Sequence, residues 1–383
     1  MVNYDSLFDP IELPNGVILD NRIAIAPMTT WSANDNGTVS DQELAYYKRR
    51  SSFAGLFISA CIAVSPTGLT FDHQFTAYND TVLPRLKKMA SAMKAQGSRA
   101  ILQIHHGGSE ALPQLTLYGR TVSASAVPSF SNPEHMPAAL TEEEIGVIIK
   151  EYGVATRQAI RAGFDGVEIH GANHYLIQQF VSAHFNRRQD DWGGSLDKRL
   201  RFPFAVLEEV RRVVQKYADP TFIVGYRFSP EEMHRYVGYS LKDSFYLIDG
   251  LINIGVDYLH VSQTDITTLP YGHEASDASN VHLLSEHINH RVPLLAAGGI
   301  QQPQQAVNGL SDGADVIAIG REAIIDPDWT QKVKADRLDT IRVTLPVDEE
   351  ARQNLVVPER LWKIITQPTG WFPLAADSEK QKN

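Results

Sequence analysis

Three side chains that follow one apolar run have the types and spacing needed to bind and protonate a carbonyl compound: His170, Asn173 and Tyr175. His170 and Asn173 are three residues apart, so they point the same way if a helical turn begins there. Two neutral N–H donors aimed at one point can hold a carbonyl oxygen and stabilise an enolate. The phenol of Tyr175 can donate a proton to a nearby carbon. The alternative is a buried polar network in which these groups only satisfy each other.

Two glycine-containing segments near the end of the chain have the composition of a phosphate site. One is Ala297-Gly298-Gly299 and the other is Gly320-Arg321, and each follows a short apolar run. Glycines let backbone N–H groups approach an anion, and the start of a following helix favours negative charge. Arg321 can bind two phosphate oxygens. The alternative is that these glycines only make tight turns between a strand and a helix.

Arg227 is a third candidate, together with Gln103, and each lies at the end of an apolar run. Burying a cation inside a folded domain costs free energy unless it meets an anion. That anion is either a carboxylate such as Glu168 or a cofactor that becomes negative on reduction. The residue pattern alone leaves both partners open.

Eight short apolar runs alternate with longer amphipathic stretches, and together these must position the three groups of side chains. The runs show little polar alternation, which is typical of strands covered on both faces. One amphipathic stretch begins with the capping-box pair Thr141 and Glu144. Eight strand–helix units in series predict an α/β fold, a (β/α)8 TIM barrel with its site where the strands end. The runs are 22–28, 56–61, 99–104, 166–170, 221–227, 258–262, 292–297 and 316–319, and the clearest helical stretches are 80–96, 141–162, 195–217 and 240–254.

Three further segments lie outside the predicted strand–helix units of the barrel. Pro14-Asn15-Gly16 is a turn signal, so residues 12–22 are expected to form an N-terminal β-hairpin that caps the bottom of the barrel. The proline-rich segment 107–140 predicts a long lid or binding loop after the third strand. We expect one domain over residues 1–375 and a polar, disordered tail at 376–383.

Composition narrows the classes of protein. The 383 residues are 43% hydrophobic and 21% charged, with a formal net charge of −10, and no basic cluster suggests a nucleic-acid partner. No apolar stretch reaches the roughly 18 residues that a membrane span needs. The single cysteine, Cys61, excludes internal disulfides and cysteine-ligated metals, so we expect no metal. The N-terminus lacks a signal-peptide pattern, so a cytoplasmic location is expected.

A larger set of motifs resembles the Old Yellow Enzyme family. The motifs follow the family's order and spacing from about residue 5 to about residue 372, and the stretch 186–195 (Asn-Arg-Arg-Gln-Asp-Asp-Trp-Gly-Gly-Ser) is the most diagnostic. The other motifs are Ala-Pro-Met-Thr at 26–29, Leu-Gln at 102–103, Ile-His-Gly-Ala-Asn-His-Tyr-Leu at 169–176, Lys-Arg-Leu-Arg-Phe at 198–202, Ala-Gly-Gly-Ile at 297–300, Ile-Gly-Arg at 319–321 and Asp-Pro at 326–327.

The resemblance implies an FMN-binding barrel that takes hydride from NADH or NADPH. Thr29 would lie near the C4 carbonyl of the flavin, Cys61 would approach the ring through its backbone, and Arg227 would stabilise the reduced flavin beside N1 and the C2 carbonyl. Gln103 would contact the pyrimidine edge, and the two glycine segments would hold the phosphate. The cofactor-binding residues implied in this way are Pro27, Met28, Thr29, Cys61, Gln103, His170, Arg227, Gly298, Gly299, Gly320 and Arg321.

The resemblance also implies the reaction. An ene-reductase of this type reduces the activated C=C bond of an α,β-unsaturated carbonyl or nitro compound in a ping-pong cycle. His170 and Asn173 would bind the substrate oxygen, and Tyr175 would donate the proton. Trp31 would narrow the substrate pocket or simply pack.

Two residues depart from the usual pattern. Thr29 stands where some relatives carry a cysteine, so this chain has no redox-sensing thiol at that point. Cys61 stands where relatives usually have glycine or alanine, so its side chain is expected to crowd the flavin edge.

The residues leave other functions and partners open. The acceptor is alternatively dioxygen, a quinone or a nitro compound, which would make the protein a flavin oxidase or reductive detoxifier. A flavin-free lyase or isomerase of a phosphorylated substrate, and a non-catalytic binding protein, are more distant alternatives. The expected partner is a small molecule, and homo-oligomer formation stays open. Residues 358–372, with Arg360, Trp371 and Phe372, either reach a neighbouring subunit's site or pack on their own barrel.

Overall fold

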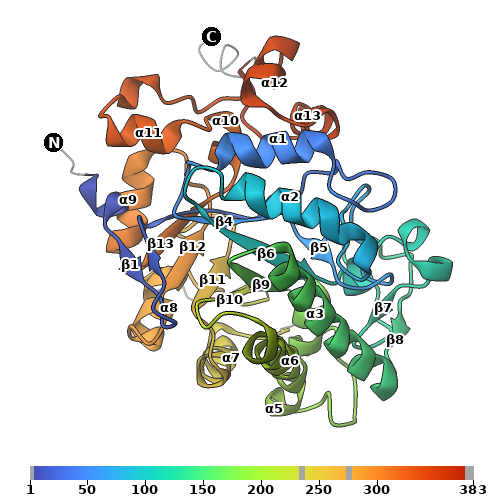
Figure 1. Cartoon of the computed structure of the whole chain (residues 1–383). Coiled ribbons are helices and arrows are strands. Elements are labelled where there is room, and N and C mark those ends of the chain that lie inside the picture. The colour runs from blue at the N-terminus through green and yellow to red at the C-terminus, as the bar shows by residue number, and fades with distance from the viewer. Residues whose placement is uncertain (1–3, 233–237, 273–277, 376–383) are drawn as a thin grey trace.

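Parallel strands close into an eight-stranded barrel in the computed structural model of the protein, which describes residues 4–232, 238–272 and 278–375 (Figure 1). Neighbouring strands follow the order β4, β3, β13, β12, β11, β10, β9 and β6, and a β4–β6 pairing closes the circle. The predicted (β/α)8 barrel is therefore confirmed. Its strands are β3 (Ile23–Ile25), β4 (Leu56–Ile58), β6 (Arg99–His105), β9 (Gly166–Gly171), β10 (Ile223–Phe228), β11 (Tyr258–Ser262), β12 (Leu294–Ala297) and β13 (Val316–Ile319).

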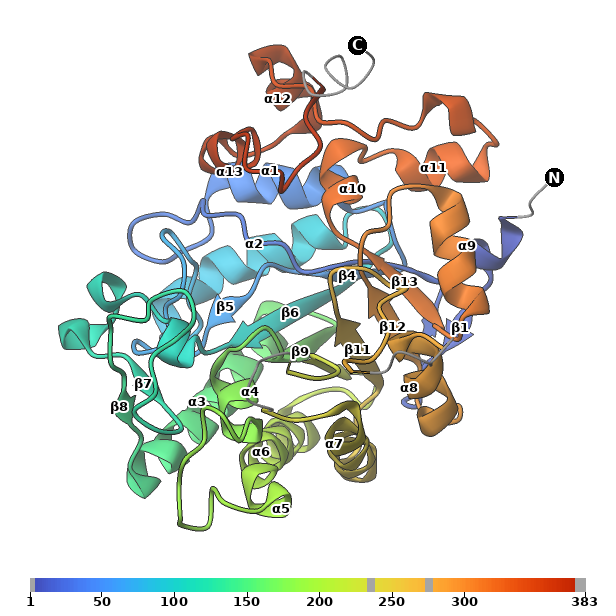
Figure 2. The same ribbon diagram turned by 180° about the vertical axis from the view of Figure 1, so that it is seen from behind.

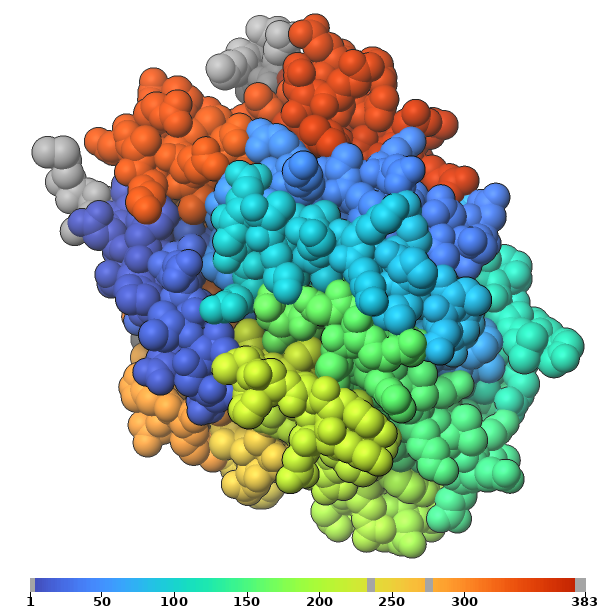
Figure 3. Space-filling view, in the orientation of Figure 1, coloured from blue at the N-terminus to red at the C-terminus, as the bar shows by residue number. Residues whose placement is uncertain are grey.

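Helices surround the barrel and cover the outer faces of the strands (Figures 1 and 2). In the space-filling view, α1 and α2 form a continuous outer layer (Figure 3). The capping box at Thr141 and Glu144 is present, and the stretch 195–217 divides into two helices at Leu200. The helices are α1 (Asp41–Arg50), α2 (Leu83–Met93), α3 (Glu142–Ala162), α4 (Leu176–Val181), α5 (Leu196–Arg199), α6 (Arg201–Tyr217), α7 (Leu241–Ile254), α8 (Asn280–Ile288), α9 (Pro303–Ser311), α10 (Arg321–Ile325), α11 (Trp329–Lys334), α12 (Glu349–Leu355) and α13 (Glu359–Ile365).

The predicted N-terminal hairpin is present and plugs the bottom of the barrel. Strands β1 (Ile11–Glu12) and β2 (Ile18–Leu19) pair antiparallel. Leu13, Val17 and Leu19 are buried in one cluster with apolar residues along the barrel strands, including the first residues of β4, β10, β11 and β13. The hairpin therefore closes the end of the barrel opposite to the one where the strands end.

The long segment after β6 is folded rather than structureless. It contains short 3₁₀ turns and a small pair, β7 (Val122–Ser123) with β8 (Ala138–Ala139), at the outer edge of the molecule (Figure 2). Arg188 links the ends of these two strands. Its guanidinium Nη1 donates to the carbonyls of Ala124, directly after β7, at 2.9 Å and Leu140, directly after β8, at 2.6 Å. The stretch 186–195, which contains Arg188, therefore holds the segment between β6 and α3 in place.

The C-terminal segment packs on its own barrel. Arg360 Nη1 donates to the Ala33 carbonyl at 3.2 Å, and the Trp371 ring meets the Trp31 ring edge-on at a centroid distance of 5.9 Å. The predicted tail at 376–383 lies outside the described residues. No helix in the described part of the chain is long and apolar enough to cross a membrane.

Candidate active site

His170 presents a neutral N–H donor at the end of β9. The side chain is 3% exposed, and its Nδ1 atom accepts a hydrogen bond from the Ala172 N–H at 3.3 Å. That bond assigns the ring proton to Nε2. Burial holds the pKa of His170 well below its ordinary value, and the neighbouring His105 and Arg227 add to the effect. The ring is therefore uncharged at neutral pH and can donate from Nε2.

Asn173 follows the strand in a left-handed turn, so the helical turn that would point His170 and Asn173 the same way is not formed. Its φ angle is 58° and that of His174 is 62°, because the chain must reverse sharply between β9 and α4. Ser262 Oγ donates to Asn173 Oδ1 at 2.9 Å, and the Asn173 N–H donates to Ser229 Oγ at 3.0 Å. The amide oxygen is thus engaged, which leaves the amide NH₂ group as the donor. His170 is not the partner of Asn173, so the two residues do not form the self-satisfied pair of the alternative interpretation.

Tyr175 lies against His170, as the proposed chemistry requires. Its ring is nearly perpendicular to those of His170, at a centroid distance of 5.0 Å, and His105, at 4.3 Å. It begins α4 without a side-chain capping bond, so its hydroxyl is not used by the helix. Burial raises the pKa of the phenol above its ordinary value, and Cys61 and Glu110 reinforce the shift. The phenol therefore keeps its proton.

His105 is an active-site neighbour that the sequence reading missed. Its ring contacts those of both Tyr175 and His170, and Nε2 is 2.9 Å from Thr70 Oγ1. Nδ1 is buried, with no hydrogen-bond partner among the described residues. Burial, with a contribution from His106, lowers the pKa of His105 to about 3. The signal in the sequence was a histidine pair directly after the apolar run 99–104.

Arg227 is a half-buried cation whose buried Nε atom has no hydrogen-bond partner in the described part of the chain. Glu168, the carboxylate considered from the sequence, is instead bonded by Gln103 Nε2 at 2.7 Å, Tyr258 Oη at 3.0 Å and His260 Nδ1 at 2.9 Å. Burial lowers the pKa of Arg227, and Glu168 opposes that shift through space. The unsatisfied guanidinium N–H therefore favours an additional acceptor, such as the edge of a cofactor.

Cys61 lies beyond strand two rather than at its end, because β4 stops at Ile58. Gln74 Nε2 donates to the Cys61 carbonyl at 3.1 Å and approaches Sγ at 3.5 Å. Burial raises the pKa of the thiol to about 12, although the charge of Arg227 and the neighbouring Thr29 and Gln74 side chains oppose the shift. The thiol is therefore protonated and packed beside Thr29. Pro27, Met28 and Thr29 are partly exposed directly after the buried strand β3.

The two glycine segments follow β12 and β13, which are neighbours in the barrel. Gly298 and Gly299 have φ angles of 151° and 65°, in the region that favours glycine. A Cβ atom on Gly320 would lie 3.0 Å from Met28 Sδ, so the absence of a side chain lets the first and last strand ends approach each other. Both segments can present backbone N–H groups at the barrel mouth.

Arg321 is the first residue of α10, and its orientation is fixed from one side. Nη1 donates to the Trp371 carbonyl at 2.8 Å, which leaves the other guanidinium N–H groups for an anion. The C-terminal segment therefore orients Arg321, a residue that is predicted to bind the phosphate.

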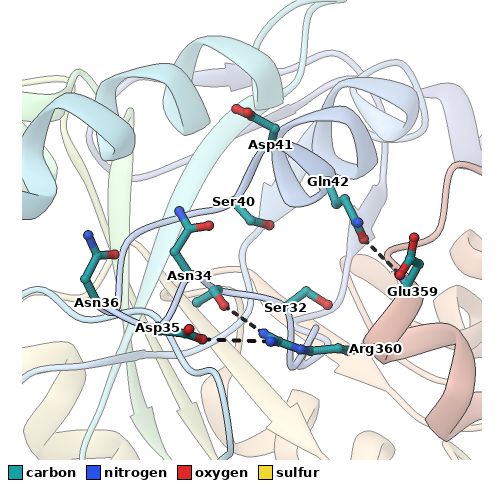
Figure 4. Close-up of a pocket in the computed structure, with 10 residues that line it drawn as sticks. Ser32, Asn34, Asp35, Asn36, Ser40, Asp41, Gln42, Glu359 and Arg360 are labelled. Atoms are coloured by element: carbon teal, nitrogen blue, oxygen red, sulfur yellow. Dashed lines mark hydrogen bonds and ion pairs between the residues drawn. The ribbon is translucent and has the colours of Figure 1, made fainter.

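Trp31 forms an aromatic wall at the mouth. Its φ angle is 47°, and its ring contacts those of Phe71 at 5.6 Å and Trp371 at 5.9 Å. Phe71 in turn meets Tyr175 at 6.4 Å. Beyond Trp31 lies a polar cavity of about 750 Å³ between the 32–36 loop, the start of α1 and α13, into which Arg360 extends beside Asp35 (Figure 4).

Comparisons with known proteins agree with this geometry. A profile of the NADH:flavin oxidoreductase / NADH oxidase family matches residues 6–340. The chain is 42% identical over 370 residues to the probable NADH-dependent flavin oxidoreductase YqiG of Bacillus subtilis, covering 97% of this chain and 98% of that protein. It is also 42% identical to the NADH:fumarate oxidoreductase of Klebsiella pneumoniae, covering 95% of this chain but only 39% of that protein. The solved structure of an old yellow enzyme homologue from Zymomonas mobilis superposes with a TM-score of 0.74 at 26% identity, covering 86% of this chain and 93% of that one.

Proposed function

The chain belongs to the NADH:flavin oxidoreductase / NADH oxidase family, and from this premise we propose that it reduces activated C=C bonds of α,β-unsaturated carbonyl or nitro compounds. Membership shows that it is an oxidoreductase of the Old Yellow Enzyme family that works with a flavin and a nicotinamide coenzyme, and we propose that the flavin is FMN. The observation that carries the finer proposal is the pairing of a neutral donor, His170, with a protonated phenol, Tyr175, at the end of β9.

The residues at the barrel mouth fit FMN. The buried Arg227 Nε lacks a partner within the described chain, and its positive charge suits the pyrimidine edge of a reduced flavin. The glycine segments and Arg321 suit the phosphate. FMN held by these residues would supply the hydride transfer that links the nicotinamide to the substrate alkene.

His170 and Asn173 hold the activating oxygen of the substrate. Negative charge develops on that oxygen when the β-carbon receives hydride, so each correctly placed donor stabilises the transition state by about 3 kcal/mol. A neutral imidazole serves this purpose, because its Nε2 proton is shared with the oxygen without being given up.

Tyr175 supplies the proton that completes the reduction. Its phenol protonates the α-carbon once charge has built up there, and the raised pKa keeps the group protonated until that moment. The perpendicular rings of His170 and His105 hold the phenol in one orientation.

The relatives support an electron-poor alkene and NADH. The Klebsiella relative is named for fumarate, an alkene conjugated to carboxylates, and the Bacillus relative is described as NADH-dependent. Because the chain spans only 39% of the Klebsiella protein, fumarate itself is one test substrate among other activated alkenes.

A second candidate keeps the cofactor and changes the acceptor. The family description includes NADH oxidase, which favours dioxygen or a quinone as the alternative. Anaerobic oxidation of the NADH-reduced protein by 2-cyclohexenone, fumarate or a nitroalkene tests the proposal. Reoxidation by dioxygen or quinone alone would favour the second candidate.

A further inference from the structure

Helix α1 packs behind the segments that we assign to the cofactor. One of its contacts is with the run 27–30, which we expect to line the flavin. Glu43 is fully buried, and its Oε1 accepts a hydrogen bond from Thr30 Oγ1 at 2.6 Å. Its Oε2 accepts from the Ser40 N–H at 2.9 Å, which completes the capping box of α1. Thr30 immediately follows Pro27-Met28-Thr29. The carboxylate therefore fixes the end of the flavin-lining run.

The second contact is with the segment after β4. The Ala60 N–H donates to the Tyr47 hydroxyl at 3.2 Å, and Tyr47 is 1% exposed. Ala60 precedes Cys61, the residue expected at the flavin edge. Tyr47 therefore holds the backbone of this second segment.

The third contact is with α10, beside the predicted phosphate site. Arg50 is fully buried, and its guanidinium donates to the carbonyls of Ala323 at 3.0 Å and Leu355 at 3.0 Å. Ala323 is two residues after Arg321. Arg50 therefore links α1 to the helix that carries the phosphate ligand.

Glu43, Tyr47 and Arg50 are spaced by four and three residues, so they occupy one face of α1. We infer that this face of α1 positions the segments that hold the flavin, and that Glu43 holds the run 27–30 most firmly when it carries its negative charge. The inference rests on the proposed FMN dependence and concerns residues that do not themselves touch the reacting atoms.

Protonation of Glu43 would weaken this contact near neutral pH. Burial raises the pKa of Glu43 to about 7, against the opposing hydrogen bonds from Thr30 and Ser40 and the charge of Arg85 on α2. Tyr47, on the same face, is the other titratable group that interacts with it, and its own pKa is raised well above the neutral range. A carboxylate accepts hydrogen bonds more strongly than a carboxylic acid, so the hydrogen bond from Thr30 to Glu43 weakens as the pH falls through 7.

The test measures the affinity of the apoprotein for flavin between pH 5.5 and 8.5, with FMN and with riboflavin. Riboflavin lacks the phosphate, whose own titration near pH 6 would otherwise overlap. We expect the wild-type dissociation constant for both ligands to rise about threefold to tenfold as the pH falls, with a midpoint near 7. Glu43→Gln keeps the shape and the cap but should bind flavin about threefold to tenfold more weakly at pH 8.5, without that midpoint.

Glu144→Gln is the matched control, because Glu144 occupies the same capping-box position in α3 and takes no part in the contacts of α1. It should bind flavin as the wild type does. A thermal melt separates positioning from loss of fold: Glu43→Gln should be at least as stable as the wild type at pH 8.5, since it no longer buries a charge.

Each outcome decides one point. A midpoint near 7 that persists in Glu43→Gln, or equal affinities at pH 8.5, would overturn the role of Glu43 in positioning these segments. Failure of the wild type to bind FMN or riboflavin at any pH would overturn the proposed function instead.

Discussion

Replacing Tyr175 by phenylalanine isolates the proton-donor role, because the ring contacts survive and only the hydroxyl is lost. The ring meets His105 at 4.3 Å and His170 at 5.0 Å, and a phenylalanine ring can make both contacts. Positioned general acids contribute typically about 10²- to 10⁴-fold, so the alkene step should slow by that factor. The loss corresponds to roughly 3–5 kcal/mol in the activation free energy. Flavin reduction by NADH needs no proton from this residue and should change less than about twofold.

Anaerobic stopped-flow measurement of the two half-reactions separates these effects. The first mixes oxidised enzyme with NADH, and the second mixes reduced enzyme with 2-cyclohexenone. Phe71→Leu is the control, because it removes an aromatic neighbour of Tyr175 but no proton. Equal losses in both half-reactions, or an unchanged alkene step, would remove Tyr175 from the proton-donor role.

Three further predictions follow from the same geometry. His170→Ala combined with Asn173→Ala should weaken the binding of phenols, which mimic the enolate, by about 10²-fold in absorbance titrations, and unchanged affinity would refute the oxyanion pair. Arg227→Gln should lower the reduction potential of bound flavin, measured by dye equilibration, because a cation that favours the reduced form is lost; an unchanged potential would place the guanidinium elsewhere. Burial lowers the pKa of His106 to about 3, so the unfolded chain binds more protons below pH 6.5 and stability falls as the pH decreases. Between pH 6.5 and 5, the free energy of unfolding in urea should therefore fall by about 2 kcal/mol less for His106→Gln than for the wild type. An identical decrease in both proteins would show that His106 does not cause the pH dependence.

Regular elements of the fold could be predicted from the sequence because local patterns determine them. Apolar runs without polar alternation predicted the buried barrel strands, and Pro14-Asn15-Gly16 predicted the hairpin at the bottom. The left-handed turn at Asn173 could not be predicted, since the reversal between β9 and α4 imposes it on residues that elsewhere prefer other conformations. The end of β4 was also misplaced, because Cys61 continues the apolar run although the strand hydrogen bonds stop earlier.

The site was predicted only in part, for a related reason. His170, Tyr175 and Arg227 follow apolar runs, so a barrel brings them to one end. Glu43 and His105 were missed because burial of a polar side chain depends on contacts with segments far away in the chain. Only the folded barrel shows that Glu43 meets Thr30 and that His105 meets Tyr175.

The visible absorption spectrum of the purified protein is the most direct test of flavin-dependent alkene reduction. It is recorded before and after anaerobic addition of NADH, and again after addition of 2-cyclohexenone. We expect a yellow protein that bleaches with NADH and regains its colour with the enone. A colourless protein that takes up no added FMN, or a bleached protein that the enone leaves reduced, would contradict it.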